Sequence, residues 1–147
     1  MTLSPHFTLA ELTVTKSSAP NVPGPAEIAA LTALCVAVLE PLRAHYGAAV
    51  SIHSGYRSPE VNAATFGSSK TSQHMRGEAA DLHVVGVDCG DVARWIKGSG
   101  LPFDQVIAET RHGSGPFTWV HVSHRADGKN RGQALQTFDG AHYSPLG

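Results

Sequence analysis

The chain has 147 residues, a mass of 15.5 kDa and a net charge of −1 at pH 7. Because eleven basic side chains nearly balance twelve acidic ones, composition gives no basic surface for nucleic acid. Two cysteines exclude a disulfide framework, and the longest apolar stretch, Ile28 to Leu39, is too short to span a membrane. Neither nucleic-acid binding nor membrane insertion is expected. Nine histidines favour metal binding or proton transfer instead.

Residues 1–24 are rich in Ser, Thr and Pro and are expected to form a partly extended arm. Within this arm, Thr8 is placed to cap a short helical turn over residues 9–12. The N-terminus lacks the basic and apolar segments of a signal peptide, so we expect a product made in the cytoplasm.

A long helix is predicted to begin at Pro25, a residue that the first helical position tolerates. Apolar side chains then recur at helical spacing along one face, at Ile28, Leu31, Cys35, Val38, Leu39, Leu42 and Tyr46. Since the pattern continues beyond Pro41, this proline is expected to kink the helix and not to end it.

Two further helices are predicted from their caps: one begins after Ser58 and runs to about Thr65, and one follows Asp88 and ends near Gly98. Residues 67–72 and 111–116 look like loops. Strands are predicted at residues 49–53, 80–85, 106–109 and 119–123. Together these elements predict a small α+β fold, one domain over residues 1–147, with a largely antiparallel sheet flanked by helices.

Two segments carry the residues best suited to metal chemistry, Ser72 to Asp81 and Trp119 to Ser123. A catalytic zinc takes three protein ligands of N or O type and keeps one open position. His74, Asp81 and His121 could supply those ligands if their strands are neighbours. His83 shares a strand face with Asp81, so these two residues form a rival pair.

Several ordered motifs make the resemblance to a known family specific. They are SGYRSP at 54–59, SxHxxGxAxD at 72–81 and WVH at 119–121, with FTLxEL at 7–12, FDQ at 103–105 and NRGQ at 130–133. The chain resembles the zinc D-Ala-D-Ala carboxypeptidases and L-alanyl-D-glutamate endopeptidases, which share the fold of the hedgehog signalling domain. The flanking motifs resemble the short phage and prophage branch.

The resemblance implies that His74, Asp81 and His121 bind Zn²⁺ and that His83 has a packing or supporting role. It implies that Arg57 holds a substrate carboxylate or the developing oxyanion, which a planar guanidinium does well. It also implies that Ser72 binds the peptide. From the residues alone, Arg57 could instead pair with Glu60 on the surface, and Ser72 could be an ordinary loop serine.

The chain departs from the family at the general base. Many relatives carry an acidic residue three positions before the last zinc histidine, where this chain has Thr118. Glu109 is the preferred candidate, because it ends a strand that a loop joins to the His121 strand. His112 and Glu78 are the second and third candidates.

The function expected from this resemblance is that of a monomeric zinc metallopeptidase acting on the stem peptide of bacterial peptidoglycan. It would be a D-Ala-D-Ala carboxypeptidase or a phage endolysin endopeptidase. Glu109 would deprotonate the attacking water, and Arg57 or His124 would help to stabilise the oxyanion. The protein would reach the wall after release through a holin-type pore or as a virion component. The alternative is a phage structural or tail module that has lost catalysis.

Overall fold

The computed structural model describes residues 1–65 and 68–147. It is an α+β domain built on a six-stranded sheet with the order β3-β4-β6-β5-β7-β8. The strands are β3 (Val50–Ser54), β4 (Ala79–Val84), β5 (Gln105–Glu109), β6 (Trp119–Ser123), β7 (Gln133–Thr137) and β8 (Tyr143–Pro145). All neighbours are antiparallel except β5 and β7, which are parallel. The sheet is therefore largely antiparallel, as predicted, with one parallel pair that makes it mixed.

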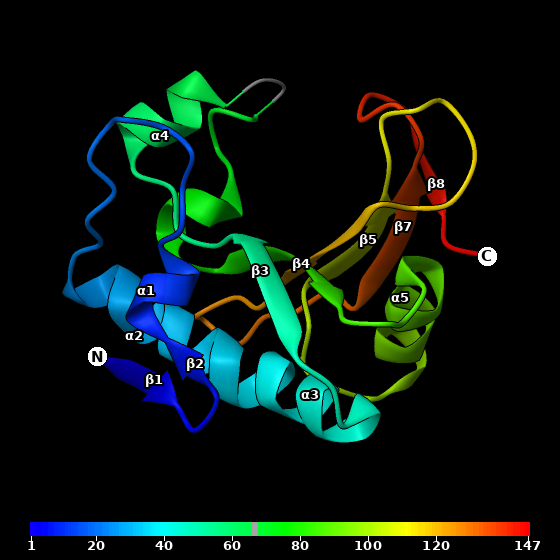
Figure 1. Ribbon diagram of the computed structural model, residues 1–147, viewed down its shortest axis with the longest axis horizontal. Helices are drawn as coiled ribbons and strands as arrows, with labels where there is room; N and C mark the ends of the chain where they lie inside the picture. Colours follow the sequence, from blue (N-terminus) through cyan, green and yellow to red (C-terminus); the bar gives the residue numbers. More distant parts are fainter. Residues whose placement is uncertain (66–67) are drawn as a thin grey trace.

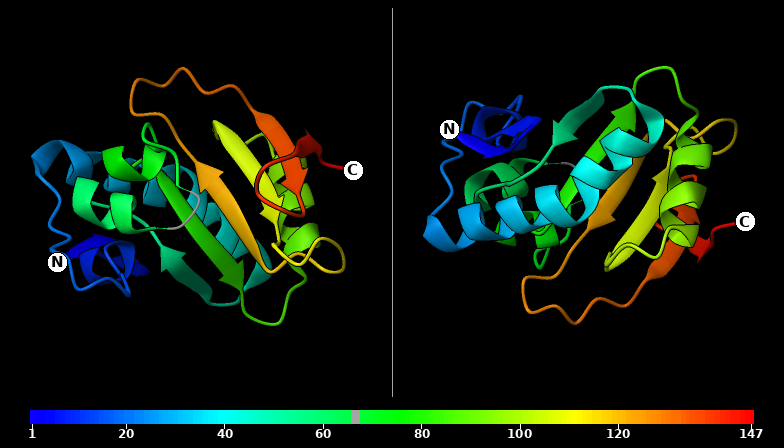
Figure 2. Two further views of the ribbon diagram at one scale, coloured as in Figure 1. Left: turned by 90° about the horizontal axis from the view of Figure 1, so that it is seen from above. Right: turned by 90° about the horizontal axis from the view of Figure 1, so that it is seen from below.

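Successive side chains along the central strands point to opposite faces of the sheet, which gives a core face and an open face. The apolar residues of the core face are all buried: Ala80, Leu82, Val84, Val106, Ala108, Val120 and Val122. Seen from below, a long helix and α5 (Cys89–Gly98) cross this face, whereas from above β4, β6 and β5 lie free of helices (Figure 2). The remaining residues of these strands point to the open face.

The long helix runs from Pro25 to Tyr46 as α2 (Pro25–Leu34), a π-helical turn η1 (Cys35–Leu39) and α3 (Glu40–Tyr46). It continues through Pro41 as predicted, and the disturbance takes the form of the π turn directly before that proline. This helix is long and apolar enough to cross a membrane by length and composition. A core helix passes the same test, and here the inward residues Leu31, Leu34 and Val38 are completely buried.

The predicted arm contains a small hairpin and one helical turn: β1 (Thr2–Ser4), β2 (Phe7–Thr8) and α1 (Leu9–Leu12). The Thr8 hydroxyl accepts a hydrogen bond from the Glu11 main-chain N–H, which confirms the predicted cap. Phe7 and Leu12 are buried in the core. Glu40 on the long helix accepts hydrogen bonds from the arm, so the arm is packed onto the domain.

The other predicted elements are present with small shifts at their ends. Ser58 caps α4 (Pro59–Ala64), and the Asp88 side chain caps α5. Not predicted from the sequence are β1, β2, β7, β8 and the 3₁₀ turn η2 (Gln73–Arg76). Gly67, where the predicted loop begins, lies outside the described residues. In Figure 1, α4 stands on one side of the open sheet face, and the β7–β8 hairpin with the 111–116 loop stands on the other.

Candidate metal centre

His74 is placed by the short turn η2. The Ser72 hydroxyl accepts a hydrogen bond from the His74 main-chain N–H at 3.2 Å and so begins the turn. Gly77 ends it in the left-handed conformation, with φ of 71°. A Cβ at Gly77 would lie 2.5 Å from the main-chain oxygen of Glu27, so only glycine lets this turn pack against α2.

The ring of His74 is oriented by the main chain of a neighbouring loop. Its Nδ1 lies 2.7 Å from the main-chain oxygen of Gly55, an acceptor that requires the proton on Nδ1. This hydrogen bond fixes the tautomer in which Nε2 carries a lone pair. That Nε2 lies 3.4 Å from Oδ1 of Asp81. His74 is thus held in the form that binds a metal.

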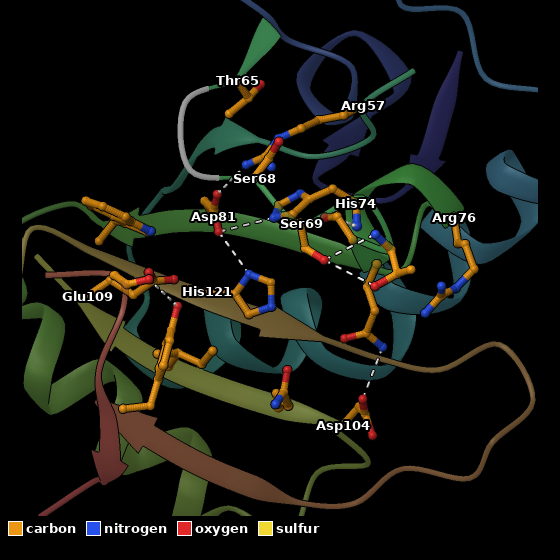
Figure 3. Close-up of a pocket in the computed structure, with 18 of the residues that line it drawn as sticks. Arg57, Thr65, Ser68, Ser69, His74, Arg76, Asp81, Asp104, Glu109 and His121 are labelled. Atoms are coloured by element: carbon orange, nitrogen blue, oxygen red, sulfur yellow. Dashed lines mark hydrogen bonds and ion pairs between the residues drawn. The ribbon is translucent and has the colours of Figure 1, made fainter. Parts of the chain in front are cut away.

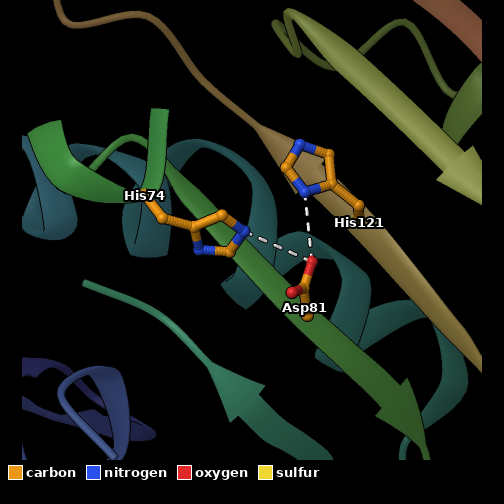
Figure 4. Close-up of side chains that lie close together, drawn as sticks. All are labelled: His74, Asp81 and His121. Carbon is orange, nitrogen blue, oxygen red and sulfur yellow. Dashed lines mark hydrogen bonds and ion pairs between the residues drawn. The ribbon is translucent and has the colours of Figure 1, made fainter. Parts of the chain in front are cut away.

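Asp81 and His121 face each other across two paired strands. They are direct partners in the β4–β6 register, so both side chains point to the open face. Nδ1 of His121 lies 3.1 Å from Oδ1 of Asp81, and all three potential ligand atoms lie within 4.8 Å of one another (Figure 4). The structure therefore brings together the three residues that the sequence analysis selected as ligands.

The ionised carboxylate of Asp81 suits a cation. Burial alone would raise the pKa of Asp81, but the adjacent imidazoles of His74 and His121 lower it well below its usual range. Burial alone would lower the pKa of His121, but the hydrogen bond and the charge of Asp81 raise it. Two imidazole nitrogens and one ionised carboxylate form a donor set that zinc accepts, so the residues fit this ion.

Arg57 supports the centre from the loop between β3 and α4. Its Nη2 donates to Oδ2 of Asp81 at 3.0 Å and its Nε donates to the Ser54 hydroxyl at 2.9 Å. The side chain is only 12% exposed. Arg57 therefore pairs with Asp81 and not with Glu60 at the surface, and it fixes the carboxylate that faces the two histidines.

The three residues lie in a cleft of about 1200 Å³ above the open sheet face (Figure 3). Arg57 and Ser72 line it on the side of α4 and η2. Residues of the C-terminal segment line the opposite side, among them Arg131 and Tyr143. The cleft therefore has walls from segments far apart in the sequence.

Glu109 lies at the end of β5 on the same face as His121. Ile107 is the direct partner of His121, so Glu109, two residues later, is its diagonal neighbour. Glu109 is 6% exposed and lines the cleft. Burial raises the pKa of its carboxyl, although His121 and Arg111 oppose this shift. Its Oε1 accepts a hydrogen bond from Nη1 of Arg111 at 3.1 Å.

The structure places the two other candidate bases away from the cleft lining. His112 is exposed in the 111–116 loop. Glu78 is buried, but its carboxylate accepts hydrogen bonds from Arg76 and from the main-chain N–H of Ala126. Neither is among the residues that line the cleft. The geometry therefore favours Glu109 over both.

Ser72, His124 and His83 were also considered from the sequence, and the structure shows what each of them contacts. The hydroxyl of Ser72 caps η2 with a lone pair while it lines the cleft. Nδ1 of His124 lies 2.6 Å from the main-chain oxygen of Pro102, away from the cleft lining. Nδ1 of His83 lies 2.6 Å from Nε2 of His53, whereas Asp81 contacts His74, His121 and Arg57.

Arg131 makes a specific ion pair with a buried carboxylate. Arg131 donates from its main-chain N, its Nε and its Nη2 to the carboxylate of Asp104, which is completely buried. Asp104 also accepts a hydrogen bond from Gln73, the neighbour of His74. The contact joins motifs 27 residues apart, and no local pattern indicates it.

Comparison with known proteins agrees with this geometry. The sequence profile of the family described as Peptidase M15 matches residues 5–123, which include the three candidate ligands, Arg57 and Glu109. No curated protein matches the chain. Members of this family are zinc-dependent peptidases, and the His74–Asp81–His121 group provides a metal site of the required kind. The chain therefore belongs to the Peptidase M15 family.

Proposed function

We propose that this protein is a zinc metallopeptidase that hydrolyses a peptide bond in the stem peptide of bacterial peptidoglycan. The observation that carries the proposal is the grouping of His74, Asp81 and His121 on the cleft floor with Glu109 buried beside them on the same face. A metal site next to a buried carboxylate is a combination that suits metal-assisted hydrolysis of an amide.

In this proposal Nε2 of His74, Nδ1 of His121 and the Asp81 carboxylate hold Zn²⁺. When bound, the ion acts as a Lewis acid on the scissile carbonyl and makes water a stronger nucleophile at neutral pH. Arg57 keeps Oδ2 of Asp81 in place, since its Nη2 donates to that atom.

Glu109 is proposed as the general base. Its Oε1 accepts from Arg111, so Oε2 is the atom assigned to take the proton from the attacking water. The C–O bond forms as this proton moves to Glu109, and the C–N bond breaks as the same proton passes to the leaving amine. The raised pKa of Glu109 suits the first transfer, because a more basic carboxylate accepts a proton more readily.

Arg57 and Ser72 are proposed to bind the substrate. Since Nε and Nη2 of Arg57 already donate to Ser54 and Asp81, Nη1 is the donor assigned to a peptide carboxylate or to the oxyanion. The Ser72 hydroxyl uses a lone pair for His74, so its O–H can donate to a peptide carbonyl.

The size of the cleft favours cleavage inside the stem peptide. Its volume of about 1200 Å³ exceeds that of ordinary small-ligand pockets, roughly 300–1000 Å³, and so suits a substrate longer than D-Ala-D-Ala. We therefore rank an endopeptidase of the endolysin type above a carboxypeptidase. Because this substrate lies outside the cytoplasmic membrane, we propose that a monomer acts there after release through a holin-type pore or as part of a virion.

The test is to incubate the zinc-loaded protein with intact peptidoglycan and to identify the products by mass spectrometry, with a chelated sample as control. Products cut within the stem, lost on chelation, are expected. Free D-Ala would support the carboxypeptidase instead. No product from protein with zinc bound would overturn the proposal and favour the structural module that lacks catalysis.

A further inference from the structure

A second histidine pair lies outside the proposed catalytic centre, on the neighbouring strands β3 and β4. Nε2 of His53 is 2.6 Å from Nδ1 of His83. His53 is exposed and His83 is half-buried, so solvent reaches the pair. The proposed peptidase chemistry uses neither residue.

A bulge in β3 produces this pair. Ile52 pairs with Leu82, but Ser54 and not His53 pairs with Asp81, which makes His53 the extra residue. A β-bulge redirects the side chain of its extra residue. Here it lets Ser54 reach Arg57 while His53 turns to His83.

The two rings have nearly the same mutual arrangement as the candidate ligands His74 and His121. The ring centroids of His53 and His83 are 4.9 Å apart with planes at 62°, against 5.2 Å and 63° for the other two rings. Zinc–nitrogen bonds of about 2.0–2.1 Å in tetrahedral geometry place two histidine nitrogens roughly 3.3 Å apart. From the present 2.6 Å, the two nitrogens need to separate by about 0.7 Å to share one ion.

We propose that His53 and His83 form a second, solvent-open site for a divalent first-row transition metal. Imidazole pairs take Zn²⁺, Cu²⁺ or Ni²⁺ and not the oxygen-preferring Mg²⁺ or Ca²⁺. Burial and the neighbouring His83 lower the pKa of His53, and the neutral ring binds metal. With only two protein ligands, and water as the others, this site binds more weakly than the centre with three.

The second site is separate from the first, although both use β4. His83 follows Asp81 by two residues, a separation of about 7 Å along a strand. Neither His53 nor His83 is among the residues lining the main cleft. The two sites can therefore be emptied independently by substitution.

The test is a titration of the metal-free full-length protein with Zn²⁺ alone, followed by isothermal calorimetry and by metal analysis after dialysis. We expect two ions per chain in the unmodified protein, the second bound more weakly. H53Q and H83Q should each lose the weakly bound ion and keep the tightly bound one. H112Q, which removes an exposed loop histidine, should keep both.

The reciprocal variant H121Q should lose the tightly bound ion and retain the weakly bound one. Circular dichroism of each variant establishes that it is folded. One ion per chain in the unmodified protein, two ions in both H53Q and H83Q, or loss of both ions in H121Q would overturn the proposal. Because the readout is stoichiometry, it holds whether or not the protein cleaves peptidoglycan.

Discussion

Thr118 donates two hydrogen bonds to the main-chain oxygen of Glu109, from its N–H at 2.8 Å and from its Oγ1 at 3.3 Å. Thr118 stands three residues before His121, where many relatives carry the acidic residue. The two positions are thus in direct contact. In the proposed mechanism, this contact would let the carboxylate of Glu109 on β5 serve in place of one on the segment before β6.

This relationship predicts that the acid can be moved back. In E109Q, the further substitution T118E should restore part of the hydrolysis rate, because it returns a carboxylate to the adjacent position. The rate of peptidoglycan cleavage is measured for E109Q, E109Q/T118E and the matched control E109Q/T118Q. A glutamate variant no faster than the glutamine control would show that the two positions are not interchangeable.

Removal of the Arg57 guanidinium should weaken zinc binding. Arg57 holds Oδ2 of Asp81, and the loss of a group that orients a metal ligand typically costs about 10–100-fold in affinity. R57Q is compared with R94Q, which removes an arginine paired with Asp91 on the surface of α5. Competition with a chromophoric chelator measures both. Equal zinc affinities in the two variants would contradict the role given to Arg57.

Replacement of Gly77 should destabilise the fold and displace His74. Alanine at this position must adopt φ near 71° and place its Cβ 2.5 Å from the Glu27 oxygen, a strain of about 1–3 kcal/mol. G98A is the control, since a Cβ at Gly98 meets nothing within 4 Å. Urea unfolding should show a lower free energy of unfolding for G77A and not for G98A. Equal stability of the two variants would disprove the close-packing argument.

The ion pair between buried Asp104 and half-exposed Arg131 predicts how stability depends on pH. The Arg131 hydrogen bonds and charge lower the pKa of Asp104 from an ordinary 3.8 to about 2. As the pH falls, the Asp104 carboxyl is therefore protonated in the unfolded chain before it is protonated in the folded protein. The pair's contribution to the free energy of unfolding is present above about pH 4 and is lost as the pH falls toward 2. Between pH 6 and pH 2, the thermal unfolding temperature should fall less in R131Q than in the unmodified protein. Parallel curves would contradict the pairing.

Local sequence signals, such as helix caps and side-chain alternation, were sufficient to predict the helices and strands that depend on residues close together in the chain. The caps at Thr8, Ser58 and Asp88 begin helices as predicted, and alternating or β-branched residues mark β3, β4, β5 and β6. The three candidate ligands followed from motif resemblance. Their grouping depends on the β4–β6 pairing, which the sequence analysis could only assume.

Features that depend on distant contacts were missed. β7 has the sequence QALQT with only its last residue buried, so its pattern is too polar to indicate a strand without the parallel neighbour β5. The Asp104–Arg131 pair joins two loops whose sequences give no sign of each other. The bulge at His53 likewise appears only once β3 and β4 are aligned.

The most direct test of the proposed mechanism is the effect of E109Q on rate and on zinc content, measured on the same preparation. A positioned general base contributes about 10²–10⁴-fold to rate, so E109Q should lose that much kcat while it keeps one tightly bound zinc and its thermal stability. E109Q that retains the full rate with zinc bound would contradict the assignment of Glu109 as the base.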